Sequence, residues 1–294
     1  MSVRIVTDST AYLPDDVVRR HGIEVVPLHV IVGGKDRVES DIRPEEVAEA
    51  LRSYTVVTTS RPTPQAFAAT YRRLAEEGAG AVVSVHLSGA MSGTVEAARL
   101  AAAEAPVPVE VIDSQTLGMA MGFAVVSGAE AAAGGAATED VSRAVTGRLG
   151  RTDVLFYVHT LEHLRRGGRM GAAAALLGSA LAIKPILAVR GGRIVALEKV
   201  RTSARAIARI EAMVHEHVAA TGLAVDLAVH HLAAAERAES VAERLRTSLA
   251  QAAEVLVVEL GAVVGAHVGP GTVAIAVSPR PDVPWPPGGA GATA

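Results

Sequence analysis

Short apolar runs alternate with amphipathic segments along the first half of this 294-residue chain. The run "VRIVTD" (Val3 to Asp8) precedes a helical segment that stops at Gly22, and "AVVSVH" and "VPVEVID" each precede a loop and a helix. Strands buried in a parallel sheet read as such apolar runs, and a helix usually connects them. The alternation predicts an α/β domain with a doubly wound parallel sheet over residues 1–150.

The pattern changes after residue 150. Two β-type runs surround the Gly191-Gly192 pair, which is typical of a hairpin, and a long helix follows from Ser203 to about Thr221. A hairpin indicates antiparallel pairing, so we predict a second α/β domain with a mixed sheet over residues 151–278. The remaining residues, 279–294, contain five prolines in sixteen positions without periodicity and are expected to be a disordered tail.

Composition narrows the functions that the chain can support. Hydrophobic residues make up 50% of the sequence but aromatic residues only 3%, so a large pocket would have aliphatic walls. Such walls suit a flexible acyl chain better than a base or a sugar, which usually stacks on aromatic rings. The net charge of −3 argues against a nucleic-acid partner. The chain has no cysteine, which excludes disulfides and thiolate chemistry and fits a cytoplasmic location.

No segment predicts secretion or membrane insertion. The N-terminus lacks the apolar stretch of a signal peptide. The longest weakly charged region, Ser114 to Thr138, is rich in Gly, Ala and Ser and contains Glu130, whereas a membrane span needs roughly 20 strongly apolar residues. We therefore expect a buried helix in this region.

Several polar loops are candidates for ligand binding. In "TTSRPTP" three hydroxyls, at positions 58–60, lie on an expected loop that leads into a helix. The simpler interpretation is that these hydroxyls cap the helix. In "HLSGAMSGT", Ser88, Ser92 and Thr94 lie on a loop entering a helix, where hydroxyls and backbone N–H groups can hold an anion.

Basic and imidazole groups supply further candidates. In "HLRRGGRMG", Arg165, Arg166 and Arg169 surround two glycines, which is either a solvated turn or an anion contact. His267, within "GAHVGPG", is expected on a tight loop, where it either carries function or packs. The histidine pairs elsewhere do not share a face, so we expect no metal site and no cofactor.

Taken together, these blocks resemble the DegV family, whose better understood members are the fatty-acid-binding subunits of bacterial fatty acid kinase. The resemblance covers about residues 3–278 and rests on an ordered series of motifs: "IVTDSTAYLP", "TTSRPTP", "LSGAMSGT", "VIDSQTLGMAMG", "LRRGGRMG", "IKPIL", "EKVRT" and "GAHVGPG".

The resemblance implies a ligand tunnel between the two domains that holds one long-chain fatty acid. Thr59 and Ser92 would bind the carboxylate, with Ser88 and Gly93 on the same loop as Ser92. His267 would lie beside the carboxylate and donate a hydrogen bond to it. Arg169 would lie close to the head group or to the partner's surface.

The resemblance also implies how the protein works. It would not be an enzyme by itself but a carrier that presents the carboxylate to a separate kinase subunit, which forms an acyl phosphate for phospholipid synthesis. The expected partners are a long-chain fatty acid, the kinase and, transiently, a membrane surface, but not a nucleic acid. The alternative is a small-molecule phosphotransferase or hydrolase that uses His267 with Asp8 or Asp113.

The sequence departs from the family's pattern at three positions. Ser88 is followed by Gly89 where the family often has two adjacent serines, Met91 replaces a common Leu, and Arg61 replaces a common Gln. These changes bear on the head-group contacts and on the acyl preference.

Overall fold

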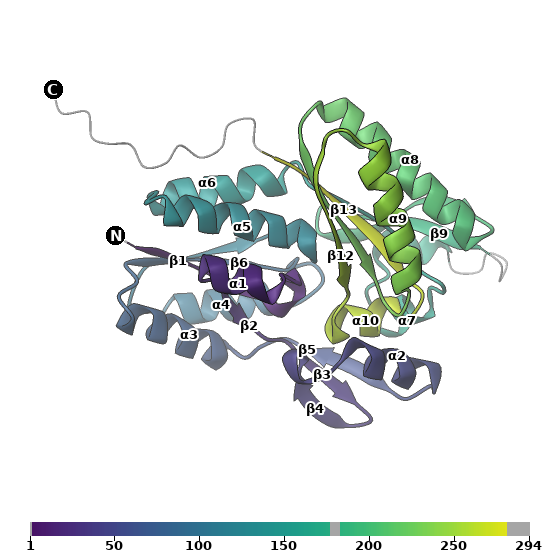
Figure 1. Cartoon of the computed structure of the whole chain (residues 1–294). Helices are drawn as coiled ribbons and strands as arrows, with labels where there is room; N and C mark the ends of the chain where they lie inside the picture. The colour runs from purple at the N-terminus through teal and green to yellow at the C-terminus, as the bar shows by residue number, and fades with distance from the viewer. Residues whose placement is uncertain (1, 177–182, 281–294) are drawn as a thin grey trace.

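The computed structural model describes residues 2–176 and 183–280. In Figure 1 most of the first half of the chain lies on the left, in purple to teal, and the second half lies on the upper right, mainly in green to yellow, while α2 and the strands β3 to β5 of the first half lie at the lower right. Each half contains its own main sheet, and the chain passes from one to the other between Leu149, the last residue of helix α6, and Asp153, the first residue of strand β8.

The first half contains a four-stranded parallel sheet with the order β2-β1-β6-β7. Its strands are β1 (Val3–Asp8), β2 (Glu24–Val26), β6 (Ala81–His86) and β7 (Val109–Asp113). Helices α3 (Pro64–Glu76) and α4 (Thr94–Ala102) lie on one face, and α5 (Met119–Ala133) and α6 (Thr138–Leu149) on the other (Figure 1). The short helices η1 (Ser9–Ala11) and α1 (Asp15–His21) follow β1. The predicted doubly wound parallel sheet is confirmed.

Helix α5 is apolar on nearly all sides because it packs between the two main sheets, against β1 and β6 of the first and against β11 and β13 of the second. This is the weakly charged region in which we expected a buried helix. None of the helices within residues 2–176 and 183–280 combines the length and the apolar character needed to cross a membrane.

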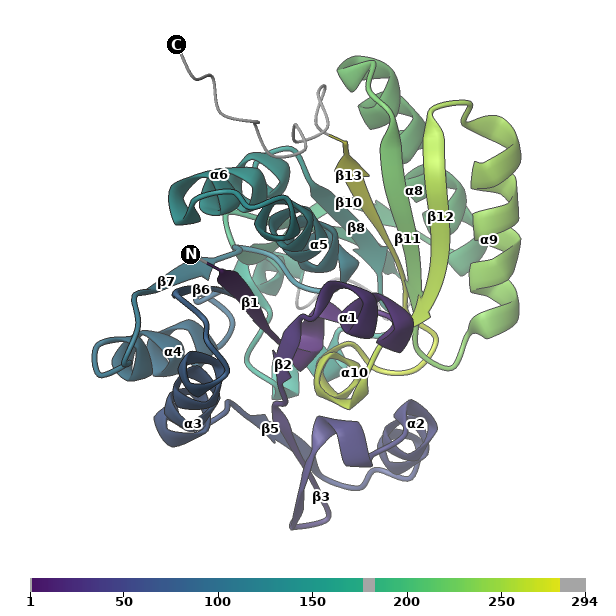
Figure 2. The same cartoon turned by 60° about the vertical axis from the view of Figure 1, so that its left-hand side comes forward.

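A small antiparallel sheet with the order β4-β3-β5 projects from the first half. It consists of β3 (His29–Val32), β4 (Lys35–Val38) and β5 (Val57–Ser60), with η2 (Glu39–Asp41) and α2 (Pro44–Arg52) in the connection (Figure 2). The β3–β4 turn is formed by Gly33 and Gly34, both at positive φ (55° and 84°), as a tight hairpin turn requires.

This small sheet corrects one expectation. Pro27 separates β2 from β3, and the two strands belong to different sheets. The hydroxyls at 58–60 do not lie on a loop but on β5, where Thr59 pairs with Val30.

The second half contains a six-stranded mixed sheet with the order β10-β9-β8-β13-β11-β12, in which only β11 and β12 are parallel. Its strands are β8 (Asp153–Tyr157), β9 (Lys184–Arg190), β10 (Arg193–Val200), β11 (Val225–His231), β12 (Ala252–Glu259) and β13 (Val273–Pro279). Helices α8 (Ser203–Thr221) and α9 (Ala235–Ser248) cover the face away from α5 (Figure 2). The predicted mixed sheet and the hairpin at Gly191-Gly192 are confirmed.

The remaining elements of the second half are α7 (Glu162–Arg166), η3 (Gly171–Leu176) and α10 (Ala262–Val268). His267 therefore lies in the last turn of a short helix. Our expectation that it lies on a tight loop was wrong. The predicted tail also begins later than position 279, since Pro279 ends β13 and the Arg280 guanidinium pairs with Asp226 at 2.7 Å. The rest of that tail and residues 177–182 lie outside the described residues.

Candidate functional site

A cavity of about 420 Å³ lies between the two halves of the chain. Ligand pockets for small molecules usually begin at roughly 300 Å³. Both halves contribute to the lining, which consists of Leu28, Thr59, Ser60, Arg61, Leu87, Met91, Ser92, Gly93, Leu117, Gly118, Val154, Phe156, Leu164, Arg169, Val189, Ile194, His230, Leu260, Val263, Val264, His267, Val268, Thr272 and Ala274.

One side of this lining is an apolar, mainly aliphatic wall formed by neighbouring strands of the six-stranded sheet. Val154 and Phe156 point to the same side of β8 because side chains two residues apart share a face. Ala274, the partner of Phe156 on β13, continues the wall on one side, and Val189 and Ile194 of the β9–β10 hairpin continue it on the other. Phe156 is the one phenyl ring in the lining, as expected for a chain with few aromatic residues.

Five polar residues of the lining form a polar cluster, which we define as Thr59, Arg61, Ser92, Arg169 and His267. Its centre is the hydrogen bond of 2.9 Å between the Thr59 hydroxyl and Nε2 of His267, which joins β5 to α10. Burial of the ring and, to a smaller extent, the nearby Arg169 guanidinium lower the pKa of His267 to about 4. At neutral pH the imidazole is therefore uncharged, and it serves as a hydrogen-bonding group.

The position of His267 depends on groups from the first half of the chain. A helix leaves its first N–H groups without partners, and on α10 the Glu39 carboxylate accepts from Val263 N at 2.8 Å and the Tyr12 hydroxyl accepts from Val264 N at 3.2 Å. Ser9 also donates to Glu39, whose pKa is raised by burial.

Ser92 and Gly93 lie on the loop that enters α4, and both line the cavity. The Ser92 hydroxyl lies 2.9 Å from the Thr94 hydroxyl and accepts from Thr94 N at 3.3 Å. Ser92 Oγ is therefore held at the start of α4 by its own loop, with its oxygen available to the cavity.

Ser88 is on the same loop but does not belong to the cavity lining. Its fully buried hydroxyl donates to the carbonyl of Gly192 at 2.7 Å, and so connects the first half to the β9–β10 hairpin. The structure thus separates two serines that we had grouped together, since Ser92 faces the cavity and Ser88 joins the two halves.

Arg169 connects two loops at the polar cluster. Its Nε donates to the carbonyl of Met91 at 3.1 Å, and its Nη1 donates to the carbonyl of Gly167 at 2.5 Å. Gly167 also lies against the His267 ring, and a Cβ at position 167 would collide with Nδ1 of that ring. Arg169 therefore lines the cavity and also holds the loops around His267 in place.

His230 is a cavity residue that the sequence analysis did not single out. It lies at the end of β11, almost fully buried, and its Nε2 accepts from Met119 N at 3.0 Å, which anchors the start of α5. Burial lowers the pKa of His230 to about 4. Its neighbour His231 faces Glu259 instead, so the "HH" pair does point to opposite sides of the strand, as expected.

The two aspartates of the alternative enzyme hypothesis do not bond to His267. Asp113 accepts from Gly89 N at 3.1 Å and Gln115 N at 2.9 Å. Asp8 accepts from His86 Nδ1 at 3.1 Å, and the chain continues through Ser84 to the hydroxyl of Tyr71. Neither aspartate lines the cavity.

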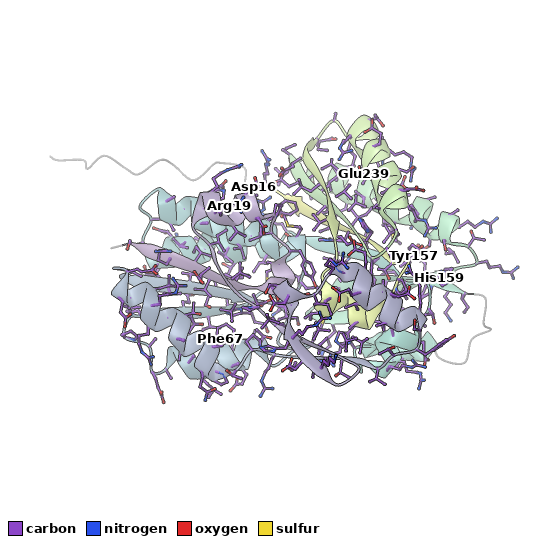
Figure 3. All side chains as sticks on the ribbon, turned by 60° about the horizontal axis from the view of Figure 1, so that its bottom comes forward. Asp16, Arg19, Phe67, Tyr157, His159 and Glu239 are labelled. Atoms are coloured by element: carbon purple, nitrogen blue, oxygen red, sulfur yellow. The ribbon has the colours of Figure 1, made fainter. Side chains whose placement is uncertain are left out.

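This Asp8–His86–Ser84–Tyr71 chain resembles a nucleophile–base pair, but all four residues are completely buried. Phe67 of α3 closes it from the side, with its ring 4.9 Å from that of His86. Figure 3 shows Phe67 on the side of the first sheet, well away from Tyr157 and His159 of the second half. This series of hydrogen bonds stabilises the interior of the first half and offers no place for a substrate. Within residues 2–176 and 183–280, no three His, Asp or Glu side chains gather as metal ligands.

Comparisons with known proteins agree with this architecture. Residues 2–280 match the family model described as "Uncharacterised protein, DegV family". A DegV domain-containing protein of Streptomyces coelicolor is 52% identical over 279 residues, which cover 95% of this chain and 99% of that protein. The chain therefore belongs to the DegV family.

Two solved structures are similar over nearly their whole length. One is a DegV family protein of Thermus thermophilus described as binding fatty acid, with a TM-score of 0.89, 36% identity and coverage of 95% of this chain and 100% of that one. The other is DegV of Bacillus subtilis, described as a fatty acid binding protein, with a TM-score of 0.87, 33% identity and the same coverage.

Proposed function

We propose that this protein binds one long-chain fatty acid in the cavity, with the carboxylate at the polar cluster and the acyl chain along the aliphatic wall. The observation that carries the proposal is the composition of a single cavity, in which two hydroxyls and an imidazole lie beside a wall of Val, Ile, Ala and Phe. The DegV proteins of Thermus thermophilus and Bacillus subtilis, both described as fatty acid binding, support it.

The energetics favour an acyl chain as the ligand. Each methylene that leaves water contributes roughly 0.8 kcal/mol, so a dozen buried methylenes outweigh the cost of ordering the chain. A hydrogen bond to a charged group contributes roughly 1.5 to 3 kcal/mol, so Thr59, Ser92 and His267 mainly orient the carboxylate. The aliphatic wall then accounts for most of the affinity, and the polar cluster determines which end of the fatty acid lies beside it.

The proposal extends to a carrier role. The protein would present the carboxylate to a separate kinase subunit for conversion to an acyl phosphate, in the cytoplasm and with transient contact to a membrane surface. Arg169, on the loop beside His267, would then serve the phosphorylated head group or the kinase. The resemblance to the subunits of fatty acid kinase motivates this part, and the lack of a bond from His267 to Asp8 or Asp113 disfavours the alternative of an enzyme built on those residues.

Native mass spectrometry of freshly purified protein tests the binding. We expect the mass of one long-chain acid per chain, a lower melting temperature after the lipid is stripped, and recovery when an acid of 14 to 18 carbons is added, because a ligand that binds only the folded state stabilises it. An apo mass together with no thermal shift for any of these acids would contradict the proposal.

A second assay separates a carrier from an enzyme. The protein is incubated with ATP and a fatty acid, with and without the catalytic subunit of a bacterial fatty acid kinase, and acyl phosphate is trapped as the hydroxamate. We expect product only when the kinase is present. Product or ATP hydrolysis without the kinase would favour the alternative of a phosphotransferase or hydrolase.

A further inference from the structure

Arg61 occupies an unusual position at the polar cluster. It directly follows β5, lines the cavity and is exposed to solvent. Its guanidinium lies against the backbone of Gly93 on the opposite loop, where a Cβ would come 2.5 Å from Nη1 and 2.9 Å from Cδ. The missing side chain at position 93 thus provides the place that the guanidinium occupies, beside Ser92.

The basic groups next to Arg61 either form hydrogen bonds within the protein or carry no charge at neutral pH. Two donors of Arg169 bond to the carbonyls of Met91 and Gly167. His267 shares its Nε2 with Thr59. Across residues 2–176 and 183–280, Arg61 forms neither a hydrogen bond nor an ion pair, so its positive charge is available to a ligand.

A guanidinium offers a planar fork of N–H donors that matches the two oxygens of a carboxylate. A Gln at this position could donate a hydrogen bond but would bring no charge. We propose that Arg61 pairs with the ligand's carboxylate, so that this site discriminates between ionised acids and neutral lipids of the same chain length. The inference rests on the proposed function and adds a residue that determines the specificity of that site.

The test measures the affinities of Arg61→Gln and the wild type for palmitic acid and for hexadecanol at pH 8, where the acid is ionised and the alcohol is neutral. Arg72→Gln is the matched control, because Arg72 is also exposed, forms no hydrogen bond or ion pair among the described residues and lies on α3 outside the cavity lining. We expect Arg61→Gln to weaken binding of the acid roughly tenfold and to leave binding of the alcohol unchanged.

Salt provides a further criterion. Because Arg61 is exposed, the difference between the wild type and Arg61→Gln for palmitic acid should shrink as the ionic strength rises. Equal binding of the acid by both proteins would overturn the inference and leave the proposed function standing. An equal loss for acid and alcohol would also overturn it, because Arg61 would then act by packing. If the wild type bound neither lipid, the proposed function would fail and the inference with it.

Gly93→Ala provides an independent check. The φ of Gly93 is −77°, so alanine fits the backbone, but its methyl group would displace the guanidinium without removing the charge. We expect a loss of a few-fold for palmitic acid in the wild-type background and no additional loss in the Arg61→Gln background, since the two changes act through one contact. Additive losses would show that position 93 acts separately from Arg61, and would overturn this part of the inference.

Discussion

The polar cluster is assembled from segments far apart in the sequence, whereas the aliphatic wall comes from neighbouring strands of one sheet. Thr59 and His267 are separated by 208 positions, yet their side chains form the central hydrogen bond of the cluster. Val154, Phe156 and Ala274 lie on the adjacent strands β8 and β13 and face the cavity because of strand geometry alone. The cluster therefore depends on how the two halves pack together, and the wall depends on the pattern within one half.

The largest effect is expected from filling the cavity at the wall. Ala274 is only 8% exposed and faces the cavity, so Ala274→Phe would occupy the space of several methylenes of the ligand. Five displaced methylenes correspond to about 4 kcal/mol, or roughly a thousandfold loss of affinity, while the fold should persist because the new ring enters an existing space. Displacement of a fluorescent fatty acid measures the affinity, and circular dichroism checks the fold.

Leu197→Phe is the control for this change, because Leu197 of β10 is 39% exposed and does not line the cavity. Its fatty-acid affinity should equal that of the wild type. Tight binding by a folded Ala274→Phe protein would mean that the acyl chain does not follow the wall.

The next effect is a decrease in the free energy of unfolding at acidic pH, caused by the two histidines of the cavity lining. The pKa of His230 falls to about 4 in the folded protein, against about 6.5 in an unfolded chain, so the unfolded state binds more protons between these values. The free energy of unfolding should therefore decrease as the pH falls from 6.5 towards 4, by ~3 kcal/mol from His230. His267, whose pKa is lowered to about 4 as well, contributes in the same direction but less, because it is partly exposed.

Urea unfolding at a series of pH values measures this dependence, with His230→Gln as the comparison. The variant should be less stable at pH 7, because it loses a buried contact, but its stability should change less between pH 6.5 and 4. An unchanged pH dependence in the variant would show that His230 is not a source of the effect. Glu39 acts in the opposite direction. Because its pKa is raised in the folded protein, the free energy of unfolding should fall as the pH rises above the ordinary pKa of a glutamate.

The smallest effects separate the two serines of the loop before α4. Ser92→Ala should weaken fatty-acid binding roughly tenfold, because its hydroxyl faces the cavity, and should cost the empty protein about 0.5 to 1 kcal/mol through the lost contacts with Thr94. Ser88→Ala should leave fatty-acid binding nearly unchanged but cost about 1 to 2 kcal/mol of stability, since it leaves the buried carbonyl of Gly192 without its partner. The same loss of affinity in both variants would contradict the division of roles.

Much of the fold could be predicted because it is encoded locally. The strand–helix alternation of the first half, the hairpin at Gly191-Gly192 and the long helix α8 all follow from periodicity and turn residues within short windows. The small sheet could not be predicted in this way, because β5 is only four residues long and pairs with a strand on the far side of α2. Its edge position is what brings Thr59 to α10.

The helix α10 is the clearest failure of local reasoning. "GAHVGPG" contains three glycines and a proline, so we expected a loop. The helix forms because Glu39 and Tyr12, more than two hundred residues earlier, satisfy its first N–H groups. These contacts are tertiary, and no pattern within the segment itself indicates them.

The sequence by itself determined that this chain forms α/β layers with an aliphatic interior, since both properties depend on which residue types recur at short spacing. Its ordered motifs also identified the family. Only the tertiary structure decided which polar groups share the cavity: it placed Ser92 towards the cavity and Ser88 away from it, joined Thr59 to His267, and set the Arg61 guanidinium beside Gly93. The physical reason is that these side chains meet only after distant segments pack together, and spacing along the chain does not determine how two separate sheets come into contact.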